Sequence, residues 1–101
     1  MNNDIIKNTA AHSLNNLQQI LNDFLPGGII KGNEYVVRNP KREDKGEGSL
    51  KINLQSGKWG DFATNDIGGD PVSLIAYLEG VSQGDAAKKL NEKYNLSCIS
   101  G

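Results

Sequence analysis

The feature that most constrains the fold is a strand–turn–strand pattern at the centre of the chain. Over residues 49–54, apolar residues alternate with polar ones, which is typical of a strand with one buried face. Residues 55–58 (Gln-Ser-Gly-Lys) then predict a tight turn, and residues 59–63 predict a second strand. We therefore expect an antiparallel hairpin with Lys51 on its outer, solvent-facing side.

The first third of the chain predicts a helix followed by another strand. Apolar residues recur every three or four positions over residues 4–25, as they do on the buried face of an amphipathic helix. Pro26 and the two glycines after it end that helix. Residues 34–38 contain a tyrosine and two valines, which favour a strand beside the hairpin.

Two further helices are expected towards the C-terminus, because both carry start signals. Asp70 precedes Pro71, as an N-cap acid precedes a proline at the first helical position, and Gly80 ends that helix. Ser82 and Asp85 have the spacing of a capping box at the start of the second helix. The sequence therefore predicts an α+β fold, with a small three-stranded antiparallel sheet, one N-terminal helix and two C-terminal helices.

The cysteine and histidine content excludes the usual cross-links of a small domain. Cys98 is the only cysteine and His12 the only histidine, so this sequence cannot form an internal disulfide or a four-ligand zinc site. A lone thiol fits a reducing compartment, and the N-terminus lacks the pattern of a signal peptide. No apolar run approaches the ~20 residues of a membrane span. We expect a cytoplasmic, metal-free protein with no membrane partner.

Charge is unevenly distributed along the chain. The formal net charge is −1, yet residues 31–58 carry seven Lys and Arg against four acids. The segments before and after them are net negative. A basic central segment points to a polyanionic partner, although a solvated loop of mixed charge would give a similar count.

Three acids lie close together in the sequence, and structural roles account for each of them. Asp70 is expected to cap a helix, Asp66 to lie in a turn, and Asp61 to make a structural hydrogen bond on its strand. The amides of Gly68 and Gly69 before the helix could hold a phosphate, but the Asp70 carboxylate would repel it. We therefore expect neither an enzyme nor a cofactor.

Several short motifs occur in one order along the chain. They are Trp59-Gly60-Asp61-Phe62-Ala63, the helix start Gly68-Gly69-Asp70, and the series Gly80-Val81-Ser82-Gln83-Gly84-Asp85-Ala86-Ala87. Together they resemble the N-terminal zinc-finger-like domain of phage and plasmid DNA primases and primase–helicases. The resemblance covers about residues 26–95 and implies a primase zinc-finger-like domain at residues 26–96. The predicted N-terminal helix (1–25) precedes this domain, and a C-terminal tail (97–101) follows it.

The chain departs from that family at all four zinc-ligand positions. Asn39-Pro40-Lys41-Arg42 stands where the relatives carry a Cys-Pro-x-His pair, and Phe62 and Asn65 stand where they carry a Cys-x-x-Cys pair. The resemblance therefore implies a zinc-ribbon-like scaffold whose metal has been replaced by side-chain packing. Trp59 and Phe62 are expected on opposite faces of their strand, so only one can fill the core. We expect Phe62 to do so, because it stands at a former ligand position.

The resemblance also implies a role in DNA replication, namely binding the single-stranded template for the primase of a phage or another mobile element. The primer-synthesising domain has no counterpart in this sequence. We therefore expect a non-catalytic monomer that acts with a primase, polymerase or helicase.

Cations beside an aromatic residue on a small sheet are typical of single-strand binders. The predicted DNA-binding residues are Arg38, Lys41, Arg42, Lys51, Lys58 and Trp59. The alternative is a protein-interaction domain that docks onto a polymerase, primase or helicase without touching nucleic acid. Trp59 either stacks on a base or only covers a thin core. Clustering of Lys41, Arg42, Lys51 and Lys58 on the face of Trp59 favours DNA, and scattering favours docking.

Overall fold

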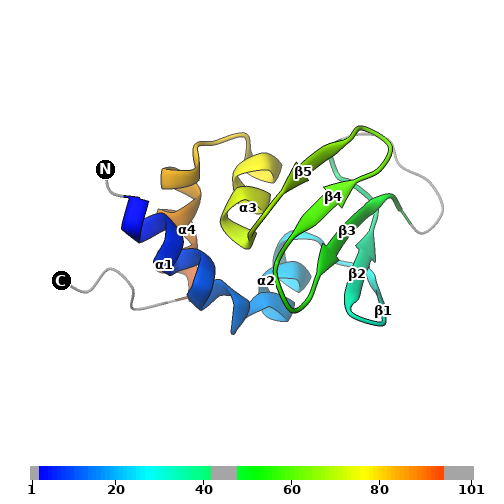
Figure 1. Cartoon of the computed structure of the whole chain (residues 1–101), viewed down its shortest axis with the longest axis horizontal. Coiled ribbons are helices and arrows are strands. Elements are labelled where there is room, and N and C mark those ends of the chain that lie inside the picture. The colour runs from blue at the N-terminus through cyan, green and yellow to red at the C-terminus, as the bar shows by residue number, and fades with distance from the viewer. Residues whose placement is uncertain (1–2, 42–47, 95–101) are drawn as a thin grey trace.

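The computed structural model describes residues 3–41 and 48–94. Within these ranges the chain forms four helices and five strands, in the order α1 (Asn3–Leu14), α2 (Leu17–Phe24), β1 (Ile29–Lys31), β2 (Glu34–Val37), β3 (Leu50–Asn53), β4 (Trp59–Asp61), β5 (Asp66–Gly68), α3 (Pro71–Glu79) and α4 (Gln83–Tyr94). The sheet occupies one end of the molecule, and α1, α3 and α4 pack together at the other (Figure 1). None of the helices in the described ranges is long and apolar enough to cross a membrane.

All neighbouring strands of the sheet are antiparallel, and they lie in the order β1–β2–β3–β4–β5. The predicted hairpin is present as β3 and β4, with Ile52 opposite Trp59. Each strand therefore pairs with the strand that follows it in the sequence, and the sheet is a simple meander (Figure 1).

The prediction of a three-stranded sheet is wrong, because the chain adds one strand at each edge. β1 pairs with β2 across a turn at Gly32 and Asn33, where Gly32 has a left-handed φ of 61°. β5 pairs with β4 across residues 62–65, where Asn65 has a φ of 65°. Both added strands are three residues long, too short to show an alternating pattern. The turn residues were the available signal, since Gly and Asn tolerate left-handed conformations.

The prediction of one N-terminal helix over residues 4–25 is also wrong, because the segment forms two helices. The break falls at Asn15 and Asn16. The Asn15 N–H donates to the His12 carbonyl and the Asn16 N–H to the Ser13 carbonyl, three residues back in each case, as in tight four-residue turns. Asparagine favours such breaks because its side chain competes for backbone groups. The break lets α2 pack on the sheet, while α1 packs against α3 and α4.

The buried apolar side chains form two adjoining cores. The sheet core lies between the sheet and the helices and contains Leu17, Leu21, Leu25, Tyr35, Val37, Leu50, Ile52, Trp59 and Leu74. The helix core contains Ile20, Val72, Ile75, Ala86, Ala87 and Leu90. Phe24 and Leu78 pack against both, so the two cores form one continuous interior.

The starts of α3 and α4 agree with the sequence analysis. The Asp70 carboxylate accepts a hydrogen bond from the Ser73 N–H at 2.7 Å, and the Ser73 hydroxyl reaches back to the Asp70 N–H at 3.4 Å, completing a capping box. Gly80 ends α3 with a left-handed φ of 70°. At the start of α4, the Ser82 hydroxyl accepts from the Asp85 N–H at 3.1 Å.

Replacing Asp70 by alanine is expected to lower the free energy of unfolding by about 0.5–2 kcal/mol, because the Ser73 N–H loses its acceptor at the helix start. Urea unfolding followed by circular dichroism measures the change. Asp70→Asn keeps a capping acceptor and should retain most of the stability. An unchanged unfolding midpoint in Asp70→Ala would contradict a stabilising cap.

Candidate nucleic-acid interface

One face of the sheet packs on the helices, and no described helix covers the other (Figure 1). Residues opposite each other in antiparallel strands share a face, so the registers place Val36, Lys51, Gly60 and Ile67 in one row across this second face. Val36 is buried in this row, at 2% exposed, whereas Ile67 is 79% exposed. We call this second face the outer face. By strand alternation it also carries Ile29, Lys31, Glu34, Arg38, Asn53, Lys58 and Phe62.

The outer face contains a hollow of about 440 Å³ whose lining includes Gly60. Along the chain, Gly60 lies between Lys58 and Phe62, which project from the same face. Across the sheet, it lies between Lys51 of β3 and Ile67 of β5. Because glycine has no side chain, the backbone of β4 forms the floor. We call this feature the Gly60 hollow.

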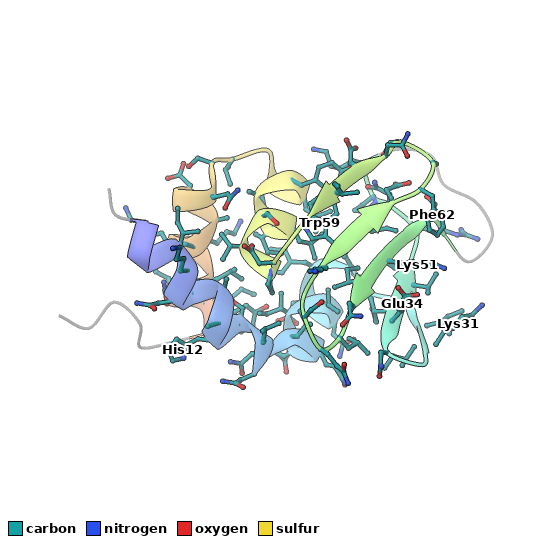
Figure 2. All side chains as sticks on the ribbon, in the orientation of Figure 1. His12, Lys31, Glu34, Lys51, Trp59 and Phe62 are labelled. Atoms are coloured by element: carbon teal, nitrogen blue, oxygen red, sulfur yellow. The ribbon has the colours of Figure 1, made fainter. Side chains whose placement is uncertain are left out.

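The walls of the Gly60 hollow combine exposed apolar side chains with cations. Phe62 is 61% exposed and Ile67 is 79% exposed. The Lys51 Nζ lies 4.7 Å from the centroid of the Phe62 ring, within cation–π range, and 3.9 Å from Glu34 Oε1. Figure 2 shows Glu34, Lys51 and Phe62 along the sheet, at the end of the molecule away from α1 and α4. The ion pair between Lys51 and Glu34 is partly exposed and therefore weak, so an incoming phosphate can compete for the lysine.

The structure brings three of the predicted DNA-binding residues to the outer face. Lys51 and Lys58 both line the Gly60 hollow. Arg38 is exposed and directly follows β2, and the alternation of that strand places it on the same face. These cations therefore share a surface with Phe62.

The other two predicted cations are not part of this cluster. The Lys41 Nζ lies 5.2 Å from the centroid of the Tyr77 ring on α3, which belongs to the helix side of the sheet. Arg42 lies outside the described residues. The predicted cations therefore do not cluster on the face of Trp59, because Lys51 and Lys58 lie on the outer face and the Trp59 side chain belongs to the sheet core.

The two aromatic residues near β4 have exchanged the positions expected from the sequence. Trp59 is 6% exposed, packs against Tyr77 with ring centroids 4.9 Å apart, and donates from Nε1 to Ser73 Oγ at 3.0 Å. Phe62, expected at the centre of the core, lies on the outer face (Figure 2). The prediction that Phe62 fills the core is therefore wrong. Trp59 is buried and presents no open ring face on which a base could stack.

The register of the β3–β4 hairpin explains this exchange. Trp59 lies opposite Ile52, and both side chains belong to the sheet core. The alternation over residues 49–54 identifies Ile52 as inward-facing. A change of one residue in the length of the turn would reverse the face of Trp59, so only the pairing of the two strands places Trp59 inside. Phe62 follows the last residue of β4 and begins the next turn. Its alignment with a zinc-ligand position did not correctly predict the burial of Phe62, because the strand register determines which face a side chain occupies.

A buried polar cluster lies behind the outer face, where the strands end. Asp61 is 1% exposed, and its carboxylate accepts hydrogen bonds from Asn39 Nδ2 at 2.7 Å, Ser49 Oγ at 2.8 Å and the Ala63 N–H at 2.8 Å. Asn39 Nδ2 also donates to the Tyr77 hydroxyl at 2.8 Å. The cluster ties the ends of β2, β3 and β4 to α3. Asp61 therefore has the structural role expected for it, whereas the sequence analysis missed Asn39.

The Tyr77 phenol at the edge of this cluster stays protonated at neutral pH. Burial is the largest influence on its pKa and raises it, and the hydrogen bond from Asn39 opposes that shift. Asp66 and Asp61 raise the pKa of Tyr77 further. A phenol that remains protonated can both donate and accept hydrogen bonds, as its contact with the Asn39 amide requires.

Three of the positions that the resemblance aligns with zinc ligands are described, and each has a different place in the structure. The described residues contain no group of three or more His, Cys, Asp or Glu side chains that could hold a metal ion. Asn39 belongs to the buried cluster, Phe62 to the outer face, and Asn65 to the left-handed turn before β5. His12 lies on α1, away from the sheet (Figure 2), and Cys98 lies outside the described residues.

Comparison with known proteins identifies no relative. The chain matches no protein-family model, no curated protein and no solved structure at a significant level. The likeness to primase domains therefore rests on the sequence motifs alone, and the structural features that bear on function are the outer face and the Gly60 hollow.

Proposed function

We propose that this chain is a non-catalytic, single-stranded DNA-binding module of the primase type and that it binds the strand on its outer face. In this proposal it serves replication of a phage or another mobile element in the cytoplasm, beside a primase, polymerase or helicase. The observation that carries the proposal is the exposed Phe62 ring in a hollow whose walls also include Lys51 and Lys58. In this proposal a base stacks on the ring of Phe62, in place of Trp59, the aromatic residue predicted from the sequence to bind DNA.

The chemistry of these side chains matches that of a single strand. Single-strand binders combine aromatic rings, on which bases stack, with cations that contact the phosphates. Lys58 precedes β4 and Phe62 follows it, so a strand that runs along β4 meets a cation at one end and the ring at the other. Lys51 lies beside this path, opposite Gly60.

Charge on the outer face favours nucleic acid over a protein partner. Ile29 and Ile67 are 44% and 79% exposed there, and a docking protein would bury them. In the described ranges, however, this face carries more cations than acids. The cations are Lys31, Arg38, Lys51 and Lys58, and the acid is Glu34. Docking of a primase, polymerase or helicase without nucleic acid is the competing outcome of the test below.

A salt-dependent titration tests the proposal. Fluorescence anisotropy is measured with a labelled single-stranded DNA, the same sequence as single-stranded RNA, and the DNA duplex. With about three phosphates contacted at ~0.7 each, log K should fall with log[salt] with a slope near −2, or about twentyfold between 50 and 200 mM. The DNA strand should bind more tightly than the duplex, because a duplex keeps its bases away from Phe62. If folded protein binds none of these ligands at low salt, the outer face is a protein-docking surface and the proposal is wrong.

Replacing Phe62 by alanine is expected to weaken single-strand binding by about 1–3 kcal/mol, the contribution of one stacked base. The same titration measures it. Val81→Ala is the matched control, because Val81 is also an exposed apolar residue, 40% exposed, and lies between α3 and α4. If both variants bind DNA as the wild type does, Phe62 is not the stacking residue.

A further inference from the structure

We infer that the Gly60 hollow holds one unstacked nucleobase of the bound strand, with Gly60 kept free of a side chain to admit it. This inference rests on the proposed function and deepens it. In this inference the protein recognises single-stranded DNA mainly through one base bound in the Gly60 hollow, and contacts spread over the rest of the sheet contribute less.

The dimensions of the hollow suit one nucleotide. Alternate residues of a strand stand about 6.7 Å apart and neighbouring strands ~4.8 Å apart. The walls at Lys58 and Phe62 are therefore separated by about 13 Å along β4, and those at Lys51 and Ile67 by about 10 Å across the sheet. The volume of about 440 Å³ is in the range of pockets that hold small organic ligands.

The chemistry of the walls is that of a nucleotide site. Phe62 and Ile67 provide an exposed aromatic ring and an exposed aliphatic side chain for the faces of a base. Lys58 lies at the other end of β4, and Lys51 lies beside Phe62 with its Nζ 4.7 Å from the ring centroid, so both cations are within reach of phosphates next to the base. The rim also carries polar side chains that can bond to the edge of the base, namely Asn53, Ser56 and Asn65.

The backbone does not explain why position 60 is glycine. Gly60 is not among the positive-φ glycines of the described chain. A Cβ there would meet the Cγ2 methyl group of Ile67 at 3.3 Å, a tight contact that rotation of this 79% exposed side chain would relieve, and the Asp66 carbonyl oxygen at 3.7 Å. Gly48 and Gly68 are different, since a Cβ there would collide with backbone or ring atoms at 2.2 Å and 2.3 Å. Glycine weakens a strand interior, and it often marks a place where a ligand approaches closely. We therefore infer that position 60 is glycine because the absence of a side chain leaves room for a ligand.

The first test fills the hollow without disturbing the fold. Gly60→Val places a residue that favours strands at the floor, and Gly69→Val is the matched control because a Cβ at Gly69 meets nothing within 4 Å. Gly60→Val should keep the thermal unfolding midpoint of the wild type, or raise it, and weaken binding to a labelled single-stranded oligothymidylate at least about tenfold, as does losing one stacked base. Gly69→Val should bind as the wild type does.

The second test uses the unchanged protein and does not depend on how Gly60→Val folds. The probes are five-nucleotide strands, one with all its bases, one with a base only at the central position and abasic sites elsewhere, and one wholly abasic. The strand with one central base should bind within about threefold of the complete strand, and the wholly abasic strand at least about tenfold more weakly than the complete one.

The outcomes separate this inference from the proposed function. If the wild type binds single strands but one central base restores none of the lost affinity, or folded Gly60→Val binds as tightly as the wild type, the single-base site is wrong and the single-strand function stands. If the wild type binds no single strand at low salt, the proposed function fails and the base site fails with it.

Discussion

Replacing Trp59 by alanine is expected to lower the free energy of unfolding by about 3–5 kcal/mol, the cost of deleting a large aromatic side chain from a packed core. Trp59 is 6% exposed, packs against Tyr77, and bonds through Nε1 to Ser73, the residue that also completes the cap of α3. Its loss opens a cavity between the sheet and α3 and leaves Ser73 without one partner. Because small domains have total stabilities of ~5–15 kcal/mol, the variant should be unfolded or close to it at 37 °C. Chemical denaturation followed by circular dichroism measures the change.

The control for this prediction is the neighbouring aromatic residue. Phe62→Ala should change the free energy of unfolding by less than about 1 kcal/mol, because the ring is 61% exposed. Trp59→Phe keeps most of the buried area and loses the hydrogen bond to Ser73, so its cost should fall between the two. If Phe62→Ala proves the more destabilising of the two alanine variants, the assignment of the inner and outer faces of β4 is wrong.

Replacing Asp61 by alanine is expected to cost about 2–5 kcal/mol of unfolding free energy. One buried donor loses its acceptor at ~1–3 kcal/mol, and two part-buried donors lose theirs at a smaller cost because water can reach them. The groups affected are the Asn39 amide, the Ser49 hydroxyl and the Ala63 N–H. Water cannot easily take the place of the carboxylate at the Asn39 amide, since both Asp61 and Asn39 are 1% exposed. Denaturant titration again gives the magnitude.

Asp66→Ala is the matched control for this second prediction. Asp66 lies opposite Asp61 in the β4–β5 register but is exposed, so its replacement should change the stability by no more than about 0.5 kcal/mol. Equal effects of the two replacements would show that the buried hydrogen bonds add nothing beyond the loss of a negative charge.

These expectations assign stability and DNA binding to different residues of the same β-strand, β4. Trp59 and Asp61 face inwards and hold the sheet to α3, whereas Gly60 and Phe62 face the Gly60 hollow. Variants on the inner side should therefore unfold the protein, and variants on the outer side should change only its affinity for the strand. A sheet with one covered and one open face makes this division possible.

Patterns that depend on neighbours in the sequence were readable without the structure. The alternation over residues 49–54, the cap at Asp70 and the stop at Gly80 each appear where expected. In each case a few consecutive residues determine the local conformation, through side-chain alternation, a short-range hydrogen bond or a left-handed φ. The basic character of the centre of the chain was equally readable, because charge does not depend on the fold.

The sequence by itself therefore determined the α+β class, the central hairpin, the start of α3 and the type of charged residue available for binding. Only the tertiary structure decided the number of strands, the break at Asn15 and Asn16, and the aromatic residue that faces solvent. Strands of three residues carry too little pattern of their own and exist because a neighbouring strand offers hydrogen bonds. Whether Trp59 or Phe62 is buried depends on a register between strands and on which sheet face α3 covers, and both are long-range contacts that no local pattern encodes.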